Sequence, residues 1–212
     1  MLENVFIYIK LNKYPKIYIC IIGYYYYIMK KCLLVIDVQY DYCEGGPMGY
    51  NNSIEIIPII NKVRDNYELI IFCGTIYPNN HSIFKKFGGT CPRHCVIDSK
   101  GSELHNDLII KDDDIKIYRG MLQKYDSSSC FYEAENISKQ TKLRQYLILN
   151  KIDEIHVCGN KFEDSIFSTV IDIIMMRLKC KIIMNAITYQ DKYKMELCNT
   201  FLKSLGIIGI DA

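Results

Sequence analysis

Residues 31–46 read KCLLVIDVQYDYCEGG, and this stretch decides the fold. Five consecutive apolar residues, 32–36, end at Asp37, which is the pattern of a strand buried on both faces of a parallel sheet. In open α/β sheets, ligands and catalytic groups lie just beyond the carboxyl ends of such strands. Asp37 is therefore a candidate catalytic carboxylate. The strand pattern alone leaves open the alternative that it caps the following turn.

Strand and helix patterns alternate along the rest of the chain. Further apolar runs predict strands at 68–75, 115–118, 154–159 and 181–185, and a short last strand at 207–210. Between them, helices are expected over a segment capped by Ser53 and over 141–150, 163–178 and 194–205. This alternation predicts one α/β domain with a mostly parallel sheet, covered on both faces by helices through right-handed crossovers.

Composition narrows the class of protein. The chain has 212 residues, half of them apolar, which suits one large domain. Its 26 basic and 24 acidic residues give a net charge of +2, so no nucleic-acid partner is expected. Many of the ten cysteines lie in apolar runs and are interpreted as reduced core residues of a cytoplasmic protein. Cys91, His94 and Cys95 lack the second ligand pair that a structural zinc site needs.

The first 28 residues form a separate segment that is basic and rich in tyrosine. Its apolar run, 17–29, is shorter than the ~20 residues of a membrane-spanning helix, and no signal-peptide cleavage site precedes the strand. We expect an N-terminal extension over 1–28 that is disordered or not part of the native protein, and a domain over 29–212. A membrane-surface anchor is the alternative for 1–28, whereas no membrane association is expected of the domain.

Three stretches resemble the nicotinamidase and isochorismatase-like cysteine hydrolases, over roughly residues 31–190. They are LLVIDVQYDYCEGG, CPRHCVIDSKGSELHNDL and YRGMLQKYDSSSCF. The second resembles the nicotinamidase branch most, with His94, Cys95, Gly101, Glu103 and His105 in order, although Cys91 replaces the usual tryptophan.

The resemblance implies a three-layer α/β/α sandwich and hydrolysis of a small carboxamide through an acyl-enzyme. In that reaction a cysteine attacks the carbonyl, an aspartate transfers protons and a lysine holds the charge. It also implies a small aromatic amide or acid as ligand and a homo-oligomeric assembly.

The implied catalytic positions depart from the family pattern at two of three places. Asp37 matches the aspartate, but Arg119 stands at the lysine position and Ser165 at the nucleophilic cysteine. Arginine keeps the charge but is planar and stays protonated, and a serine hydroxyl needs a dedicated base. Cys130 and Cys158 are alternative candidates for the nucleophile, but neither begins a helix, so both are disfavoured.

The implied metal motif, an aspartate with histidines two and six residues later, is also altered. Its positions hold Thr75, Tyr77 and His81, so no metal or other cofactor is expected and His81 is interpreted as a loop residue. Family members carry a strained, sometimes cis, peptide before the nucleophile, and residues 160–163 occupy that turn. The remaining candidate substrate-binding residues are Gln39, Tyr42, Tyr77, Lys161 and Phe162.

Three hypotheses follow from these departures. The first is a degenerate, inactive or strongly altered homologue of enzymes that hydrolyse nicotinamide to nicotinate and ammonia. The second is an active hydrolase of a small amide or vinyl ether that uses Asp37 with Ser165 and Arg119. The third is an oligomeric binding or scaffold protein.

Overall fold

The computed structural model describes residues 2–10, 18–26, 29–134 and 138–212, the first two ranges by their backbone only. Strands β1 (Leu2–Lys10) and β2 (Tyr18–Tyr26) pair with each other in antiparallel orientation. Neither pairs with the main sheet in the described part of the chain. Residues 1, 11–17 and 27–28 lie outside the described residues, and the expectation that 1–28 is an extension stays a prediction.

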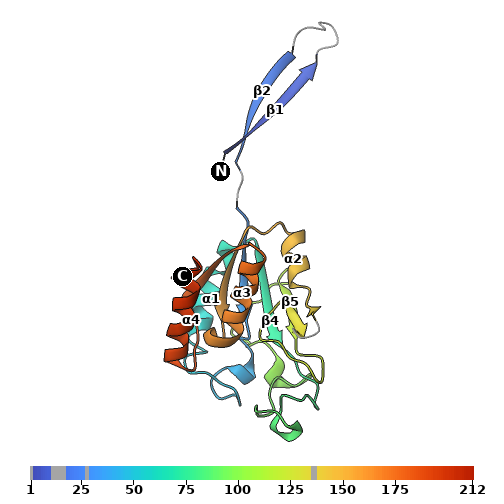
Figure 1. Cartoon of the computed structure of the whole chain (residues 1–212), viewed down its shortest axis with the longest axis vertical. Coiled ribbons are helices and arrows are strands. Elements are labelled where there is room, and N and C mark those ends of the chain that lie inside the picture. The colour runs from blue at the N-terminus through green and yellow to red at the C-terminus, as the bar shows by residue number, and fades with distance from the viewer. Residues whose placement is uncertain (1, 11–17, 27–28, 135–137) are drawn as a thin grey trace.

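Six parallel strands form the main sheet in the order β10-β9-β8-β3-β4-β5 (Figure 1). They are β3 (Lys31–Ile36), β4 (Leu69–Thr75), β5 (Ile115–Arg119), β8 (Glu154–Gly159), β9 (Lys179–Ile187) and β10 (Ile208–Ile210). Strand β3, which opens the stretch 31–46, lies inside the sheet and is hydrogen-bonded to a neighbouring strand on each side. A small antiparallel pair, β6 (Tyr132–Ala134) and β7 (Lys139–Gln140), lies apart from it.

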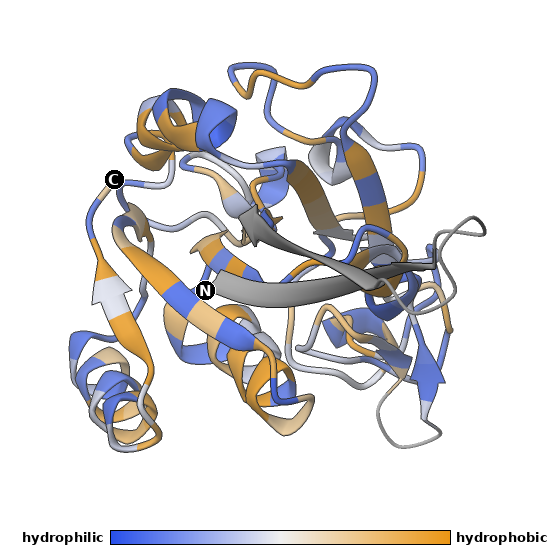
Figure 2. Ribbon diagram, turned by 90° about the horizontal axis from the view of Figure 1, so that it is seen from above, coloured by the Kyte–Doolittle hydropathy of each residue, from blue (hydrophilic) through white to orange (hydrophobic). Residues whose placement is uncertain are grey.

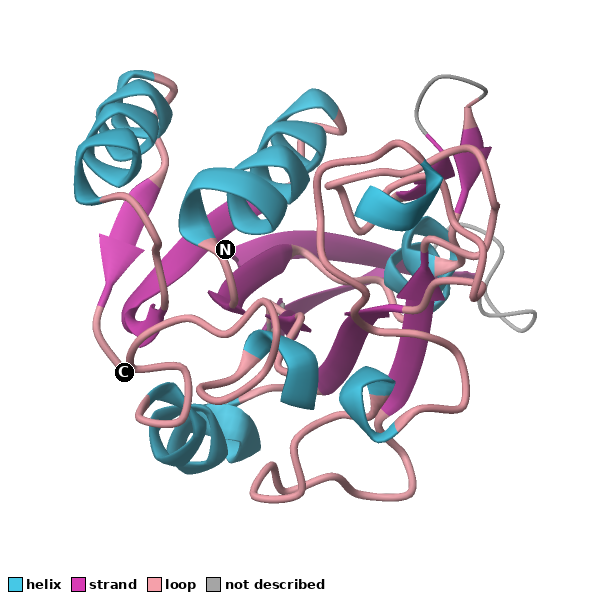
Figure 3. Ribbon diagram, turned by 90° about the horizontal axis from the view of Figure 1, so that it is seen from below, coloured by secondary structure: helices cyan, strands magenta, loops and turns pink. Residues whose placement is uncertain are grey.

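Helices cover both faces of this sheet (Figure 3). Helix α1 (Ile56–Val63) packs on one face through a core that includes Leu33, Val35 and Phe72. Helices α2 (Leu143–Leu149), α3 (Phe167–Met175) and α4 (Lys192–Ser204) pack on the other, against Leu34 and Ile36. Adjacent residues of β3 thus face opposite layers, which is why the whole run is apolar. Figure 2 shows hydrophobic residues along the strands of the sheet and in the helices around it. The predicted three-layer α/β/α sandwich is confirmed.

Two helix predictions need correction. Ser53 does not cap α1: its hydroxyl accepts the backbone N–H of Glu44 at 2.7 Å, and the residue before the helix, Glu55, makes no side-chain cap. The predicted helix 163–178 is a π-helical turn, η6 (Phe162–Ile166), followed by α3, which ends before Arg177. Arg177 has φ of 58°, a left-handed conformation that terminates a helix.

The short helical turns η1 (Tyr40–Tyr42), η2 (Arg64–Asn66), η3 (Lys85–Phe87) and η4 (Lys100–Ser102) lie between the main elements. None of the helices in the described ranges is long and apolar enough to cross a membrane. The nine cysteines whose side chains are described are all free thiols.

Candidate active site

The strand order places the site. The chain runs outward from β3 through β4 to β5 on one side, and from β8 through β9 to β10 on the other. The crevice beyond the carboxyl ends of β3 and β8 is therefore the topological switch point, where α/β proteins bind ligands. Asp37 directly follows β3, and the turn at residues 160–165 follows β8.

Asp37 is held by backbone contacts to both neighbouring strands. Its φ of 53° is unusual for a residue that is not glycine. Its N–H donates to the carbonyl of Cys73 at 2.8 Å, and its own carbonyl accepts from the Asn160 side chain at 3.0 Å. Asn160 in turn accepts from the Thr188 hydroxyl at 2.8 Å. These bonds fix the direction in which the Asp37 carboxylate leaves the backbone.

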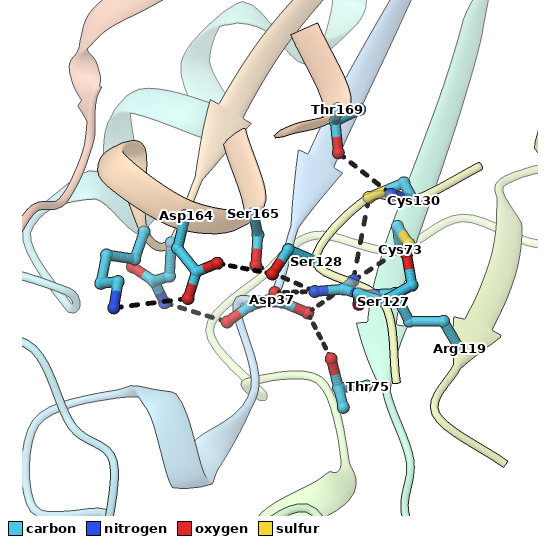
Figure 4. A network of polar contacts seen from close by, with 12 residues as sticks. Asp37, Cys73, Thr75, Arg119, Ser127, Ser128, Cys130, Asp164, Ser165 and Thr169 are labelled. Atoms are coloured by element: carbon cyan, nitrogen blue, oxygen red, sulfur yellow. Dashed lines mark hydrogen bonds and ion pairs between the residues drawn. The ribbon is translucent and has the colours of Figure 1, made fainter. Parts of the chain in front are cut away.

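Asp37 and Arg119 form a buried ion pair (Figure 4). Arg119 Nη2 lies 2.6 Å from Oδ2 of Asp37, and Nη1 lies 3.1 Å from Oδ1, which also accepts from the Thr75 hydroxyl at 3.1 Å. Both side chains are less than 5% exposed. Burial alone would lower the pKa of Arg119, but the Asp37 carboxylate raises it well above the usual value, so the guanidinium stays charged.

Ser165 contacts the same guanidinium. Arg119 Nη2 donates to the Ser165 hydroxyl at 2.9 Å, while Nε donates to the Ser127 carbonyl at 2.9 Å. Nη1 also points at the thiols of Cys73 and Cys130, at 3.5 and 3.8 Å. Arg119 is the only hydrogen-bond partner of the Ser165 side chain within the described residues. The guanidinium thus contacts both the carboxylate and the hydroxyl, and every N–H direction it has is used inside the protein.

A small pocket of about 80 Å³ opens over this network. Asp37, Arg119 and Ser165 line it, as do the predicted residues Tyr42, Tyr77 and Lys161. The other lining residues are Met48, Tyr50, Ile83, Cys91, His94, Asp126, Ser127, Ser128, Asn160 and Asp164.

Two predicted substrate-binding residues do not reach the surface of that pocket. The Gln39 side chain is fully buried, with its amide bonded to backbone groups of Thr75 and Ser102. It joins the end of β4 to the η4 turn. Phe162 is fully buried in the core beneath α3.

Neither of the alternative nucleophile candidates, Cys130 and Cys158, lines the pocket. Cys130 is fully buried between Arg119 and α3, where its N–H donates to the Thr169 hydroxyl at 3.0 Å. Burial alone would raise the pKa of its thiol, but the hydrogen bond with Cys73 and the charge of Arg119 lower it. Cys158 lies inside β8, and burial raises the pKa of its thiol well above the usual value.

Several residues of the pocket were missed by the sequence reasoning. Asp164 immediately precedes Ser165, accepts from the Ser128 hydroxyl at 2.6 Å and pairs with Lys161 at 3.4 Å. Asp126 accepts from the Tyr77 phenol, with both oxygens at 3.1 Å. Asp164 adjoins Ser165 in the sequence, and Asp126 follows shortly after Arg119. This proximity to predicted catalytic residues could have identified both. The peptide between Asn160 and Lys161 is cis, at the turn where the family resemblance placed such a bond.

The positions of the implied metal motif do not fit a divalent cation. Thr75 donates to Asp37, and the Tyr77 phenol donates to Asp126. His81 is 1% exposed; its Nδ1 accepts the N–H of Ile83 at 3.1 Å, so its Nε2–H donates to the Tyr125 carbonyl at 3.0 Å. A metal ligand needs a free lone pair, and this imidazole has none to offer. Among the described residues no group of three or more His, Cys, Asp or Glu could hold a metal ion.

Comparison with known proteins places this site in a family context. The model of the isochorismatase domain family matches residues 31–197. The nicotinamidase of Acinetobacter baylyi is 28% identical over 170 residues, 73% of this chain and 79% of that protein. The Escherichia coli nicotinamidase is 27% identical over 172 residues, 72% of this chain and 80% of its own.

Solved structures agree in fold. PnC1 from L. infantum, crystallised with nicotinate, superposes with a TM-score of 0.82 at 25% identity, covering 86% of this chain and 93% of that one. The pyrazinamidase of Pyrococcus horikoshii in complex with zinc gives a TM-score of 0.78 at 24% identity, and the match covers 86% of this chain and 99% of that one.

Proposed function

Because this chain belongs to the isochorismatase domain family, within its nicotinamidase branch, we propose that it binds a small aromatic ligand in the pocket over Asp37 without hydrolysing it. The relatives with this fold include nicotinamidases and a protein crystallised with nicotinate. The pocket is small, about 80 Å³, and Tyr42, Tyr50 and Tyr77 line it, which suits a single substituted ring and not a polymer segment.

One observation carries the proposal: the guanidinium of Arg119 contacts both groups that would have to work together. A serine nucleophile needs a base that accepts its proton. Both oxygens of Asp37 are bonded to Arg119, and the hydroxyl of Ser165 is bonded to Arg119 as well. Arginine has no acceptor and does not give up a proton in proteins, so it cannot relay a proton from Ser165 to Asp37.

The charge arrangement supports the same conclusion. In acyl transfer, a donor must remain available for the oxygen that becomes negative. The N–H groups of Arg119 are engaged by Asp37, Ser127, Ser165 and the two thiols. No donor of this side chain is left for a substrate carbonyl, whereas a compact ammonium at the same position would keep hydrogen-bonding directions free.

A second candidate function, hydrolysis by Asp37 with Ser165 and Arg119, has one observation in its favour. The three side chains converge, and all line the pocket. It would require the guanidinium to withdraw from between the carboxylate and the hydroxyl. A hydrolase would release ammonia from a small amide, whereas a protein that only binds the amide would release none.

The experiment compares ammonia release from nicotinamide by the unaltered protein and by two variants, Ser165→Cys and Ser165→Cys with Arg119→Lys. The unaltered protein and the single variant are expected to release none, because Arg119 still engages Asp37. Asp37→Ala serves as the control for contaminating hydrolases. Release by the unaltered protein that disappears in Asp37→Ala would refute the proposal and establish the hydrolase.

A further inference from the structure

Tyr77 stands where the metal motif of the family has its first histidine, and its ring fills the space beside the other candidate ligands. The ring centroid lies 4.5 Å from that of His81 and 5.2 Å from that of His94. The Tyr77 side chain is 3% exposed, and its hydroxyl donates to the carboxylate of Asp126. This end of the pocket is therefore built from aromatic rings and a carboxylate, where a cation would sit in a metal-binding relative.

The charges around the pocket are balanced everywhere except at this end. Asp37 is paired with Arg119, and Asp164 is paired with Lys161. Asp126 lines the same pocket, and its hydrogen-bond partner is the neutral phenol of Tyr77. No cationic group lies within ion-pair distance of Asp126 in the described part of the chain.

His94 adds a second acceptor to this end of the pocket. Its Nδ1 lies 2.8 Å from the carbonyl of Pro92, so Nδ1 carries the hydrogen and donates it. The lone pair of the neutral ring is then on Nε2. His94 lines the pocket with Asp126 and Tyr77.

We propose that the Tyr77 end of the pocket recognises a hydrogen-bond donor, and best an ammonium group, on the ring of its ligand. A metal ion at this place would accept a lone pair, such as that of a pyridine nitrogen. Asp126 and His94 offer lone pairs themselves, so the complementary ligand group must bring N–H bonds and a positive charge. The inference rests on the proposed function, because it assigns the ligand class of the same pocket.

Calorimetric titration with three probes of similar size tests this preference. The probes are 3-(aminomethyl)benzamide, which carries an ammonium group, nicotinamide, which carries a lone pair, and benzamide, which carries neither. The ammonium probe is expected to bind at least about fivefold more tightly than the other two. Equal affinities, tighter binding of nicotinamide, or no binding of the ammonium probe would overturn the inference.

Asp126→Asn is the informative variant, because its amide oxygen can still accept from Tyr77 while the charge is gone. It should lose the preference for the ammonium probe and keep the affinity for benzamide. Asp113→Asn is the matched control: it removes an exposed carboxylate from the turn before β5, outside the pocket, and should leave all three affinities unchanged. A preference that persists in Asp126→Asn would also overturn the inference.

Measuring ammonia in the same samples tests the non-hydrolysing function separately from the ligand class. Release of ammonia together with an intact preference would refute the non-hydrolysing function and leave the ligand class standing. Binding without any preference and without ammonia would refute the ligand class alone.

Discussion

Replacing Asp37 by alanine should lower the free energy of unfolding by about 3–5 kcal/mol, the usual cost of removing one partner of a buried ion pair. The magnitude follows from the environment of Arg119. Its side chain is 3% exposed, and the carboxylate removed makes contacts of 2.6 and 3.1 Å with it. The guanidinium cannot escape the cost by losing a proton.

The double variant Asp37→Ala with Arg119→Met distinguishes the effect of the buried charges from the effect of lost side-chain packing. Arg119→Met alone should destabilise less than Asp37→Ala, because a buried carboxylate can neutralise itself by taking up a proton. Asp37→Ala combined with Arg119→Met leaves no buried charge from the pair. It should be about 1–3 kcal/mol more stable than the sum of the two single effects implies.

Urea unfolding followed by far-UV circular dichroism measures these differences, since the chain has no tryptophan for fluorescence. Lys100→Met is the control: Lys100 and Glu103 form an exposed pair at 2.7 Å, with side chains 65% and 58% exposed, and no clear change is expected. A loss below about 1 kcal/mol in Asp37→Ala, or strict additivity in the double variant, would refute a buried, structural role for the pair.

Two further perturbations have clear expected outcomes. Changing Thr75 to Asp and Tyr77 to His removes the phenol that fills the space and adds two ligand groups beside His94, whose Nε2 carries a lone pair. Zn²⁺ titration should therefore give binding in the double variant and none in the unaltered protein, and equal Zn²⁺ affinity in both would contradict the reasoning. Burial lowers the pKa of His156, whose ring lies between the Tyr67 hydroxyl and Glu154. The unfolded chain therefore binds more protons, and the free energy of unfolding should fall as pH drops below about 6.5; unfolding curves of His156→Gln should show a flatter dependence, and an unchanged slope would contradict this.

Most of the sheet could be predicted because β3, β4 and β8 are buried on both faces. Such strands are continuous apolar runs in the sequence, and their ends are marked by Asp37, Thr75 and Gly159. The helix boundaries were harder to predict from the sequence. Ser53 has the chemistry of a cap, but its hydroxyl is used by Glu44, nine residues earlier, in a tertiary contact that no local pattern reveals.

The catalytic positions were placed by family resemblance, whereas their interactions were not. Nothing in the sequence near Arg119 says that its guanidinium reaches Asp37 and Ser165 at once, because those residues are 82 and 46 positions away. The same holds for Asp126, which joins the pocket through Tyr77. Gln39 was among the predicted substrate-binding residues, but its amide satisfies backbone groups of Thr75 and Ser102, 36 and 63 positions away.

The central claim is that the pocket holds a small aromatic ligand and leaves it intact. One NMR experiment tests both halves: 3-(aminomethyl)benzamide and nicotinamide are incubated with the unaltered protein, and saturation-transfer and one-dimensional spectra are recorded over a day. We expect saturation transfer to the ammonium probe, with both amides unchanged at the end. Growth of the carboxylate signals of either compound, absent with Asp37→Ala, would contradict it.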